Sequence, residues 1–322
     1  MAVLKDVLYL LVYPGLFFLT SFALFAEWVD RKVYARLQNR MGPLHTGYEG
    51  MLQPLADVIK LMLKEDIIPE KADRFMFSAL PVAGMTLVTT AALLLPVWHI
   101  GPMPSFNSFP GDLIVIIYIL SLATLVLFLA GWHSTNPFST IGGFRVITML
   151  FGYEIPFLLA LLGPAILADS WRMSEIAAFY QVHPALLLVN ALGFFVALIS
   201  LQAKLERTPF DIPHAETEIV GGTFTEFSGK KYAYLKSMCT LEMVVGSGVI
   251  AAVFMGGFPG GVWIGMVHFI VKTTVIIMLL SLIRALHSRI RVEQVVTFAW
   301  KYLMPLAVLQ ILVVIIAKGW IE

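Results

Sequence analysis

Long apolar runs alternate with short polar segments along this chain. Eight of the runs are long enough to cross about 30 Å of hydrocarbon as α-helices. The pattern therefore predicts an all-α integral membrane protein with about eight transmembrane helices. The predicted spans are residues 7–29, 75–97, 112–132, 142–168, 184–205, 238–258, 262–283 and 298–318.

The segment GYEGMLQPLADVIKLMLKE, between the first two spans, has a different pattern. Its apolar residues recur at helical spacing, with charged residues beside them. A helix of this kind lies in the membrane interface with its apolar face toward lipid or protein. We expect one amphipathic interface helix here, with Leu52, Leu55, Ile59 and Leu63 on its apolar side and Asp57, Lys60 and Lys64 on its polar side.

Basic residues are distributed unevenly between the two sides of the predicted membrane domain. Sixteen lie in or beside three segments, 30–74, 204–237 and 284–297, whereas the opposite side has only Lys5 and two others, Arg172 and Lys318. The positive-inside rule then places the three segments in the cytoplasm and both termini outside. We expect residues 1–322 to form a single membrane domain, multi-pass in the cytoplasmic membrane of the cell.

Composition agrees with this class and limits the chemistry. The chain is 59% hydrophobic and 13% charged, with a net charge of +1, and its mean hydropathy is +0.84. A soluble protein would be about a quarter charged, and a net charge so close to neutral gives no basis for a nucleic-acid partner. Cys239 is the only cysteine, and one thiol cannot hold an iron–sulfur cluster. We predict no metal site and no catalytic residue in this chain.

Charged residues fall inside predicted spans, among them Arg145, Glu154, Glu242 and Lys272. Each would cost about 3 kcal/mol at the centre of a bilayer, so all four should face the protein interior or a wet cavity. Arg145 and Glu154 are nine residues apart, which puts them on opposite sides of a helix. Such residues can act as structural links between helices or, as we favour, as part of a chain of titratable groups.

The segment ERTPFDIPHAETEIVGGTFTEFSG, residues 206–229, has five acidic residues. Pro209 and Pro213 exclude a continuous helix, and the segment is too apolar for a fully solvated loop. Either it is a solvated acidic loop or, as we favour, it folds back so that its carboxylates line a polar cavity. Buried neighbouring acids titrate as a set, so the second arrangement predicts a proton reservoir or relay.

Other familiar sites are not recognisable. No paired histidines have haem spacing, no glycine-rich phosphate or dinucleotide signature lies between a strand and a helix, and no Ser/His/Asp arrangement is legible. Redox chemistry therefore has to be supplied by partner subunits.

Four blocks of sequence resemble one known family. DRKVYARLQNRMGPLHTGYEGMLQPLADVIKLMLKED (30–66), GWHSTNPFSTIGGFRVITMLFGYEIP (131–156), the acidic segment, and RALHSRIRVEQ with WKYLMP are similar to blocks of the H subunit of respiratory complex I, also called NADH dehydrogenase subunit 1. The resemblance covers nearly the whole chain. It implies an eight-span, non-catalytic subunit that joins a peripheral redox arm to antiporter-like membrane subunits.

The resemblance, together with the burial argument, assigns candidate roles. The predicted proton relay comprises Asp30, Glu154, Glu206, Asp211, His214, Glu216, Glu218, Glu226 and Glu242, of which Glu154, Asp211, Glu216, Glu218 and Glu242 are expected to share one cavity. Charged support for the relay is expected from Arg145, Lys272, Arg289 and Arg291. Docking of the redox arm is expected to use Arg36, Arg40, Asp57 and Lys60.

Several residues depart from the family pattern. Asp30 stands where the family usually has Glu, and Lys204 and His214 stand where complex I typically has acids. KEDIIPEKADRF is more similar to the corresponding segment of energy-converting membrane-bound nickel–iron hydrogenases and their sulfur-reducing relatives. On this basis a ferredoxin-linked, hydrogenase-type complex that pumps protons or sodium is the first hypothesis.

This hypothesis sets the expected cofactors and partners. Iron–sulfur clusters, with a nickel–iron centre or a flavin, would lie in peripheral subunits on the cytoplasmic side. Antiporter-like and small membrane subunits, together with lipid, would surround the chain. One alternative is the quinone-site subunit of an NADH or related quinone oxidoreductase. An alternative of another class is a stand-alone secondary transporter, which would move its substrate without partners.

Overall fold

The computed structural model describes residues 11–12, 15–97 and 108–321, and the start of the predicted first span and Lys5 lie outside this part. Its secondary structure consists of helices and helical turns, with no strand among the described residues. The elements are α2 (Leu16–Leu37), η1 (Tyr48–Gly50), α3 (Gln53–Leu63), α4 (Arg74–Leu93), α5 (Asp112–His133), α6 (Pro137–Ala168), α7 (Met173–Val182), η2 (Pro184–Asn190), α8 (Ala191–Lys204), α9 (Glu216–Ile219), η3 (Gly222–Phe224), α10 (Gly229–Phe254), α11 (Val262–Leu286), α12 (Val292–Phe298), the π-helical turn η4 (Ala299–Leu303) and α13 (Met304–Ile321).

The all-α membrane class is confirmed. Within the described residues, seven helical segments are long and apolar enough to cross a membrane, and each coincides with one of the last seven predicted spans. The helix α2 covers most of the remaining predicted span. The interface helix is also present, as α3.

The three segments predicted as cytoplasmic loops are shorter in the structure, because the neighbouring helices extend into them. The segment 204–237 is shorter as a loop than expected, because α10 begins at Gly229. Likewise α2 continues to Leu37 and α11 to Leu286, which shortens 30–74 and 284–297. A hydropathy pattern places the end of a span at its first charged residues. The helix itself can continue beyond the hydrocarbon, because its polar side chains reach water or a partner there.

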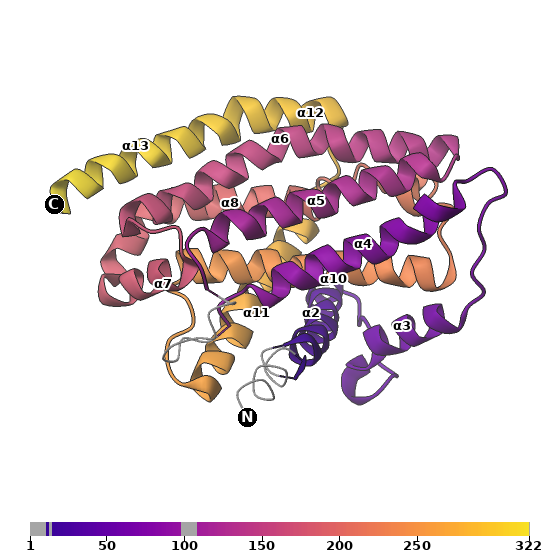
Figure 1. Ribbon diagram of the computed structural model, residues 1–322, viewed down its shortest axis with the longest axis horizontal. Helices are drawn as coiled ribbons and strands as arrows, with labels where there is room; N and C mark the ends of the chain where they lie inside the picture. Colours follow the sequence, from indigo (N-terminus) through magenta and orange to yellow (C-terminus); the bar gives the residue numbers. More distant parts are fainter. Residues whose placement is uncertain (1–10, 13–14, 98–107, 322) are drawn as a thin grey trace.

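The helices α4, α5, α6, α8, α10 and α13 run roughly along the longest axis of the molecule, whereas α2 is seen nearly end-on (Figure 1). Along one side, α4, α5, α6 and α13 pack in succession, and α8 packs on α6 and α13. The almost wholly buried helix α10 lies against α2, α4 and α11. The short helix α3 lies at the edge of this bundle, against α2 and α10.

Loops predicted to share a side of the membrane contact one another. At one end, Ser228 Oγ accepts a hydrogen bond from Ile67 N at 3.2 Å, and Lys231 Nζ lies 2.5 Å from Asp66 Oδ2. We call these two contacts the clasp. At the opposite end, Met173 N donates to Asp112 Oδ1 at 2.8 Å. The relative sidedness of these loops therefore agrees with the basic-residue pattern, and the orientation of the chain in a cell remains a prediction.

A buried polar cluster joins α13 to the rest of the bundle. Pro164 has no N–H, so the carbonyl of Ala160 lacks its usual helical donor. Gln310 Nε2 lies 3.4 Å from that oxygen and 3.2 Å from Asn190 Oδ1. Two glycines make room for Gln310, because a Cβ on Gly163 or Gly193 would lie 1.9 or 2.4 Å from its amide. Small residues at such positions let membrane helices approach closely and bond across the interface.

We expect Gly193→Ala to destabilise the bundle. The added methyl would collide with the Gln310 amide, and overpacking of this kind lowers the free energy of unfolding by about 1–3 kcal/mol. Thermal unfolding of the purified complex in mild detergent measures the loss. Gly319→Ala is the matched control, since a Cβ there meets nothing within 4 Å. Equal melting temperatures for the two variants would contradict the packing argument.

Candidate functional site

The acidic segment folds back against the helices, as we favoured. Its apolar side chains Phe210, Ile212, Ile219 and Phe227 are buried. The segment approaches α6 so closely that a Cβ on Gly142 would lie 2.7 Å from Thr223 N. Glycine at this position thus permits the loop to pack on the bundle, and the alternative of a fully solvated loop is wrong.

A charged cavity of about 110 Å³ lies between this loop, α8 and α10. It is large enough for several water molecules. Glu206 and Glu242 are both buried, and Glu242 Oε1 has no hydrogen-bond partner among the described residues. Two basic side chains, Lys204 and His214, face the same space. The lining residues are Leu127, Lys204, Leu205, Glu206, His214, Phe224, Cys239 and Glu242.

Lys204 connects this cavity to Glu154. The Lys204 side chain is fully buried, and its Nζ lies 3.1 Å from Glu154 Oε2. The ammonium also lies 5.5 Å from the centre of the Tyr153 ring, a cation–π distance. Ser121 Oγ donates a second hydrogen bond to the Glu154 carboxylate. A carboxylate in the middle of α6 is thereby supplied with both charge and hydrogen bonds.

His214 is held between an acid and an aromatic ring. Its Nε2 lies 2.5 Å from Glu206 Oε2, and its ring stacks on Phe224 with 4.4 Å between centroids. Burial by itself would lower the pKa of His214, but the charge and hydrogen bond of Glu206 outweigh burial, and the net shift is upward from 6.5. Such a histidine holds its proton more firmly than a free imidazole near neutral pH.

The other predicted relay acids do not line the charged cavity. Glu216 and Glu218 are exposed, so the expectation that these two share a buried cavity with Glu154 and Glu242 is wrong. They lie on α9, a single helical turn whose other side packs on the protein. Three acids of the segment pair elsewhere: Glu218 with Arg145 at 2.6 Å, Asp211 with Arg289 at 3.0 Å, and Glu226 with the side-chain amide of Asn136.

Asp30 is the centre of a separate ion network. It is buried, and its carboxylate binds Arg207 at 2.8 Å and Arg284 at 3.1 Å. Ser281 Oγ donates a further hydrogen bond at 2.7 Å. The network thus joins α2, the acidic segment and α11. No cavity residue takes part in it, so Asp30 lies beside the predicted relay rather than within it.

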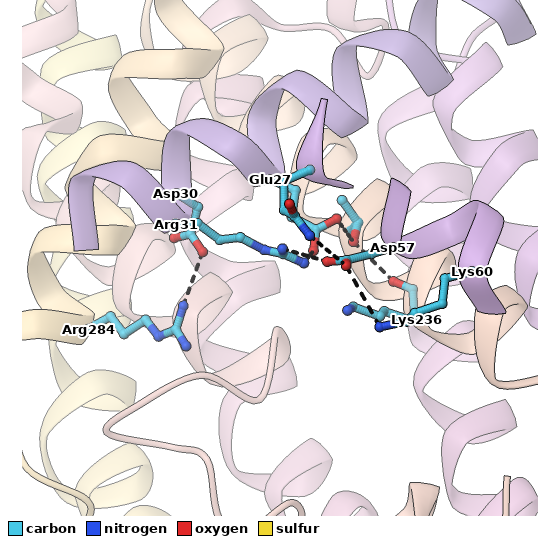
Figure 2. A network of polar contacts seen from close by, with 9 residues as sticks. Glu27, Asp30, Arg31, Asp57, Lys60, Lys236 and Arg284 are labelled. Carbon is cyan, nitrogen blue, oxygen red and sulfur yellow. Dashed lines mark hydrogen bonds and ion pairs between the residues drawn. The ribbon is translucent and has the colours of Figure 1, made fainter. Parts of the chain in front are cut away.

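The neighbouring residue on α2 faces another cluster (Figure 2). Arg31 binds Asp57 of α3 at 2.7 Å and also pairs with Glu27 one turn back. Burial by itself would raise the pKa of Asp57, but hydrogen bonds from Arg31 and Gln53 outweigh it and the net shift is downward. The interface helix is therefore attached to α2 by a partly buried ion pair. Asp57, which we expected to dock the arm, is occupied by this contact.

The second cavity is mostly apolar and has a volume of about 220 Å³. It lies between α2, α3, α4 and α10, and Glu27 and Asp57 of the preceding cluster lie in its wall together with Lys236 and Thr240. The rest of the wall is made largely of apolar side chains, among them Ala23, Leu24, Val58, Leu61, Met62, Met85, Ala233 and Leu241.

The two cavities lie on opposite sides of one turn of α10. Cys239 and Glu242 line the charged cavity, whereas Thr240 and Leu241 line the apolar cavity. These pairs point to opposite sides because successive residues of a helix are about 100° apart. A ligand in the apolar cavity would therefore touch the turn that carries Glu242.

The remaining predicted residues lie apart from both cavities. Lys272 Nζ donates to the backbone oxygens of Met255 and Gly257 and so caps the far end of α10. Arg36, Arg40 and Lys60 are exposed, as a docking role requires, and Arg291 caps α12. In the described part of the chain, no group of three or more His, Cys, Asp or Glu side chains could hold a metal ion.

Sequence reasoning did not assign roles to several residues of these sites. Lys204 has its partner fifty positions away, Arg207 lies 177 positions from Asp30, and Arg284 lies 254 from it. No periodicity connects such distant residues. The one available signal was that Lys204 occupies a span end where the resemblance leads one to expect an acid.

We expect the stabilising contribution of His214 to depend on pH. Because its folded pKa lies above 6.5, the Glu206–His214 pair contributes fully below that pH and is lost as the pH rises through the folded pKa. His214→Gln should therefore lower the melting temperature more at about pH 6 than at about pH 9. The exposed His287→Gln serves as control, and an equal loss for His214→Gln at both pH values would argue against a protonated pair.

Comparison with known proteins shows the family of this chain. A model of the NADH dehydrogenase family matches residues 10–315. The H subunit of the NADH-quinone oxidoreductase of Dehalococcoides mccartyi (strain 195) is 35% identical over 308 residues, covering 95% of this chain and 84% of that protein. Subunit 8 of Thermus thermophilus NADH-quinone oxidoreductase is 37% identical over 312 residues, covering 94% and 84%, and the H subunit from Syntrophotalea carbinolica is 34% identical over 301 residues, covering 91% and 90%. The chain therefore belongs to the NADH dehydrogenase family, as a member of the group formed by the H subunits of complex I.

Proposed function

We propose that this chain is the quinone-site subunit of an NADH–quinone oxidoreductase of the complex I type. In this proposal the apolar cavity admits the quinone, and the charged cavity passes the redox event on to ion movement. The observation that carries the proposal is the turn of α10 shared by the two cavities. The similar proteins named above are subunits of NADH-quinone oxidoreductases, which supports this branch over the hydrogenase-type branch.

The lining of the apolar cavity suits a quinone. Apolar side chains form most of its wall, and the hydroxyl of Thr240 and the ammonium of Lys236 can donate hydrogen bonds to a quinone carbonyl. Its volume of about 220 Å³ lies below the roughly 300–1,000 Å³ of drug-sized sites. The cavity thus suits a ring-sized head group, with the apolar tail extending along the outside of α2 and α3.

The redox cofactors of this proposal belong to partner subunits. One cysteine gives this chain no means to hold an iron–sulfur cluster. A flavin and iron–sulfur clusters would lie in a peripheral arm that docks on the cytoplasmic loops. Arg36, Arg40 and Lys60 are exposed cations in the segment 30–74, and they are available to pair with carboxylates of the arm.

The charged cavity provides the coupling route. Glu242, the Glu206–His214 pair and the Lys204–Glu154 pair form a continuous set from α10 to α6. Water in the cavity would connect their side chains. The exposed Glu216 and Glu218 would exchange protons with solvent at the loop surface. Antiporter-like subunits would receive the charge change at the α6 side and move protons or sodium.

Filling the apolar cavity should block quinone reduction. Ala233 is buried in its wall, and Ala233→Phe places a ring in the space the quinone would occupy. Electron transfer from NADH to a water-soluble acceptor should remain, while reduction of a quinone falls at least about tenfold. Val82→Phe, on an exposed position of α4 outside the wall, is the control. Normal quinone reduction in an assembled Ala233→Phe complex would refute the site.

Neutralising the coupling carboxylates should reduce ion pumping. Glu154→Gln and Glu242→Gln keep the shape of the side chain and remove its titration. Each should lower ion uptake per electron in inverted vesicles while the arm still co-purifies with the membrane subunits. Glu293→Gln, at an exposed position of α12, is the control. Full pumping in both cavity variants would leave these acids with a structural role only.

A further inference from the structure

Three carboxyl groups share two basic side chains in and beside the charged cavity. The acids are Glu154, which is partly buried, and the buried Glu206 and Glu242, and the basic side chains are those of Lys204 and His214. His214 is already paired with Glu206, since its Nε2 lies 2.5 Å from Glu206 Oε2. Lys204 is therefore the cation left for both Glu154 and Glu242, although it contacts only Glu154, at 3.1 Å.

Glu242 lacks such a contact. Its side chain is 2% exposed, it lies in the wall of the cavity that Lys204 also lines, and its Oε1 has no hydrogen-bond partner among the described residues. A buried ionised carboxylate without a partner is costly, and it is relieved either by a proton or by an approaching cation. In this cavity, water could deliver a proton and Lys204 could approach as the cation.

Lys204 has the freedom to be that cation. It is the last residue of α8, and an ammonium on a four-carbon stem has three donors and many rotamers. The Glu154 hydrogen bond uses one donor. The cavity of about 110 Å³ that Lys204 lines leaves room for this side chain to move. Ser121, which also donates to Glu154, can hold that side chain in place when the ammonium leaves.

We propose that Lys204 is a shared counter-cation whose ammonium moves between Glu154 and Glu242 and decides which of the two carboxyl groups is ionised. With the ammonium at Glu154, the proton resides on Glu242. With the ammonium at Glu242, the proton resides on Glu154. One carboxyl group loses its O–H bond as the other gains one, the proton crosses through cavity water, and Lys204 keeps all its protons. This inference rests on the proposed coupling function and names the positioning residue that gives the route its direction.

The test compares variants of the intact complex in inverted vesicles. Lys204→Gln removes the charge, and we expect electron transfer and arm attachment to persist while ions pumped per electron fall about tenfold. Lys204→Arg keeps a cation that cannot lose its proton, and we expect it to restore most of the pumping. Arg pumping as poorly as Gln in an assembled complex would overturn the shared-cation role.

A purely structural role predicts a different result. If Lys204 only neutralises Glu154, the double variant Glu154→Gln/Lys204→Gln leaves neither charge stranded and should assemble and pump as well as Glu154→Gln alone. We expect the double variant to assemble and to pump less than Glu154→Gln alone, because Glu242 has also lost its counter-cation. The comparison also serves if Lys204→Gln does not assemble, and equal pumping by the double variant and Glu154→Gln would overturn the proposal.

Failure of this inference is distinguishable from failure of the proposed function. Loss of pumping in Glu242→Gln with normal pumping in Lys204→Gln would overturn the role of Lys204 alone. Normal pumping in Glu242→Gln and Glu154→Gln would overturn the coupling route and the Lys204 role with it. Normal quinone reduction in Ala233→Phe bears only on the apolar cavity.

Discussion

A charge placed in hydrocarbon has to meet an opposite charge or water, and the arrangement of this bundle depends on that constraint. Asp30 on α2 is matched by Arg207 and Arg284, which come from the acidic segment and from α11. Glu154 on α6 is matched by Lys204 at the end of α8. Each pair joins segments far apart in sequence. Correct pairing and correct helix packing are therefore achieved together, because a misplaced helix would strand a buried charge.

Close packing gives these pairs fixed positions. Glycines on α6 and α8 admit the acidic segment and the Gln310 amide at distances that any larger residue would prevent. Almost every residue in the second half of α10 is buried, so this helix cannot shift without moving its neighbours. A rigid α10 with one cavity on each side can transmit a local change across its width, as the proposed coupling of a redox step to ion movement requires.

Hydropathy and basic-residue counts predicted the helix class, the interface helix and the relative sidedness of the loops, because these properties follow from transfer between water and hydrocarbon. The same reasoning found that charges within spans must face inward, and Glu154 and Glu242 do so. It could not predict that Glu216 and Glu218 would be exposed while Glu206 is buried, because a loop with proline and glycine has no periodicity that assigns its faces. Nor could it find Lys204 and Glu154 as partners, since that contact is made by tertiary packing alone.

The clasp has a mechanical consequence. By joining Ile67 and Asp66 to Ser228 and Lys231, it connects the segment after α3 to the first turn of α10, so that the two loops are expected to move as one unit. A partner bound to either loop would therefore displace α3 and α10 together. Because both helices line the apolar cavity, binding of such a partner would change the width of the cavity without a separate hinge.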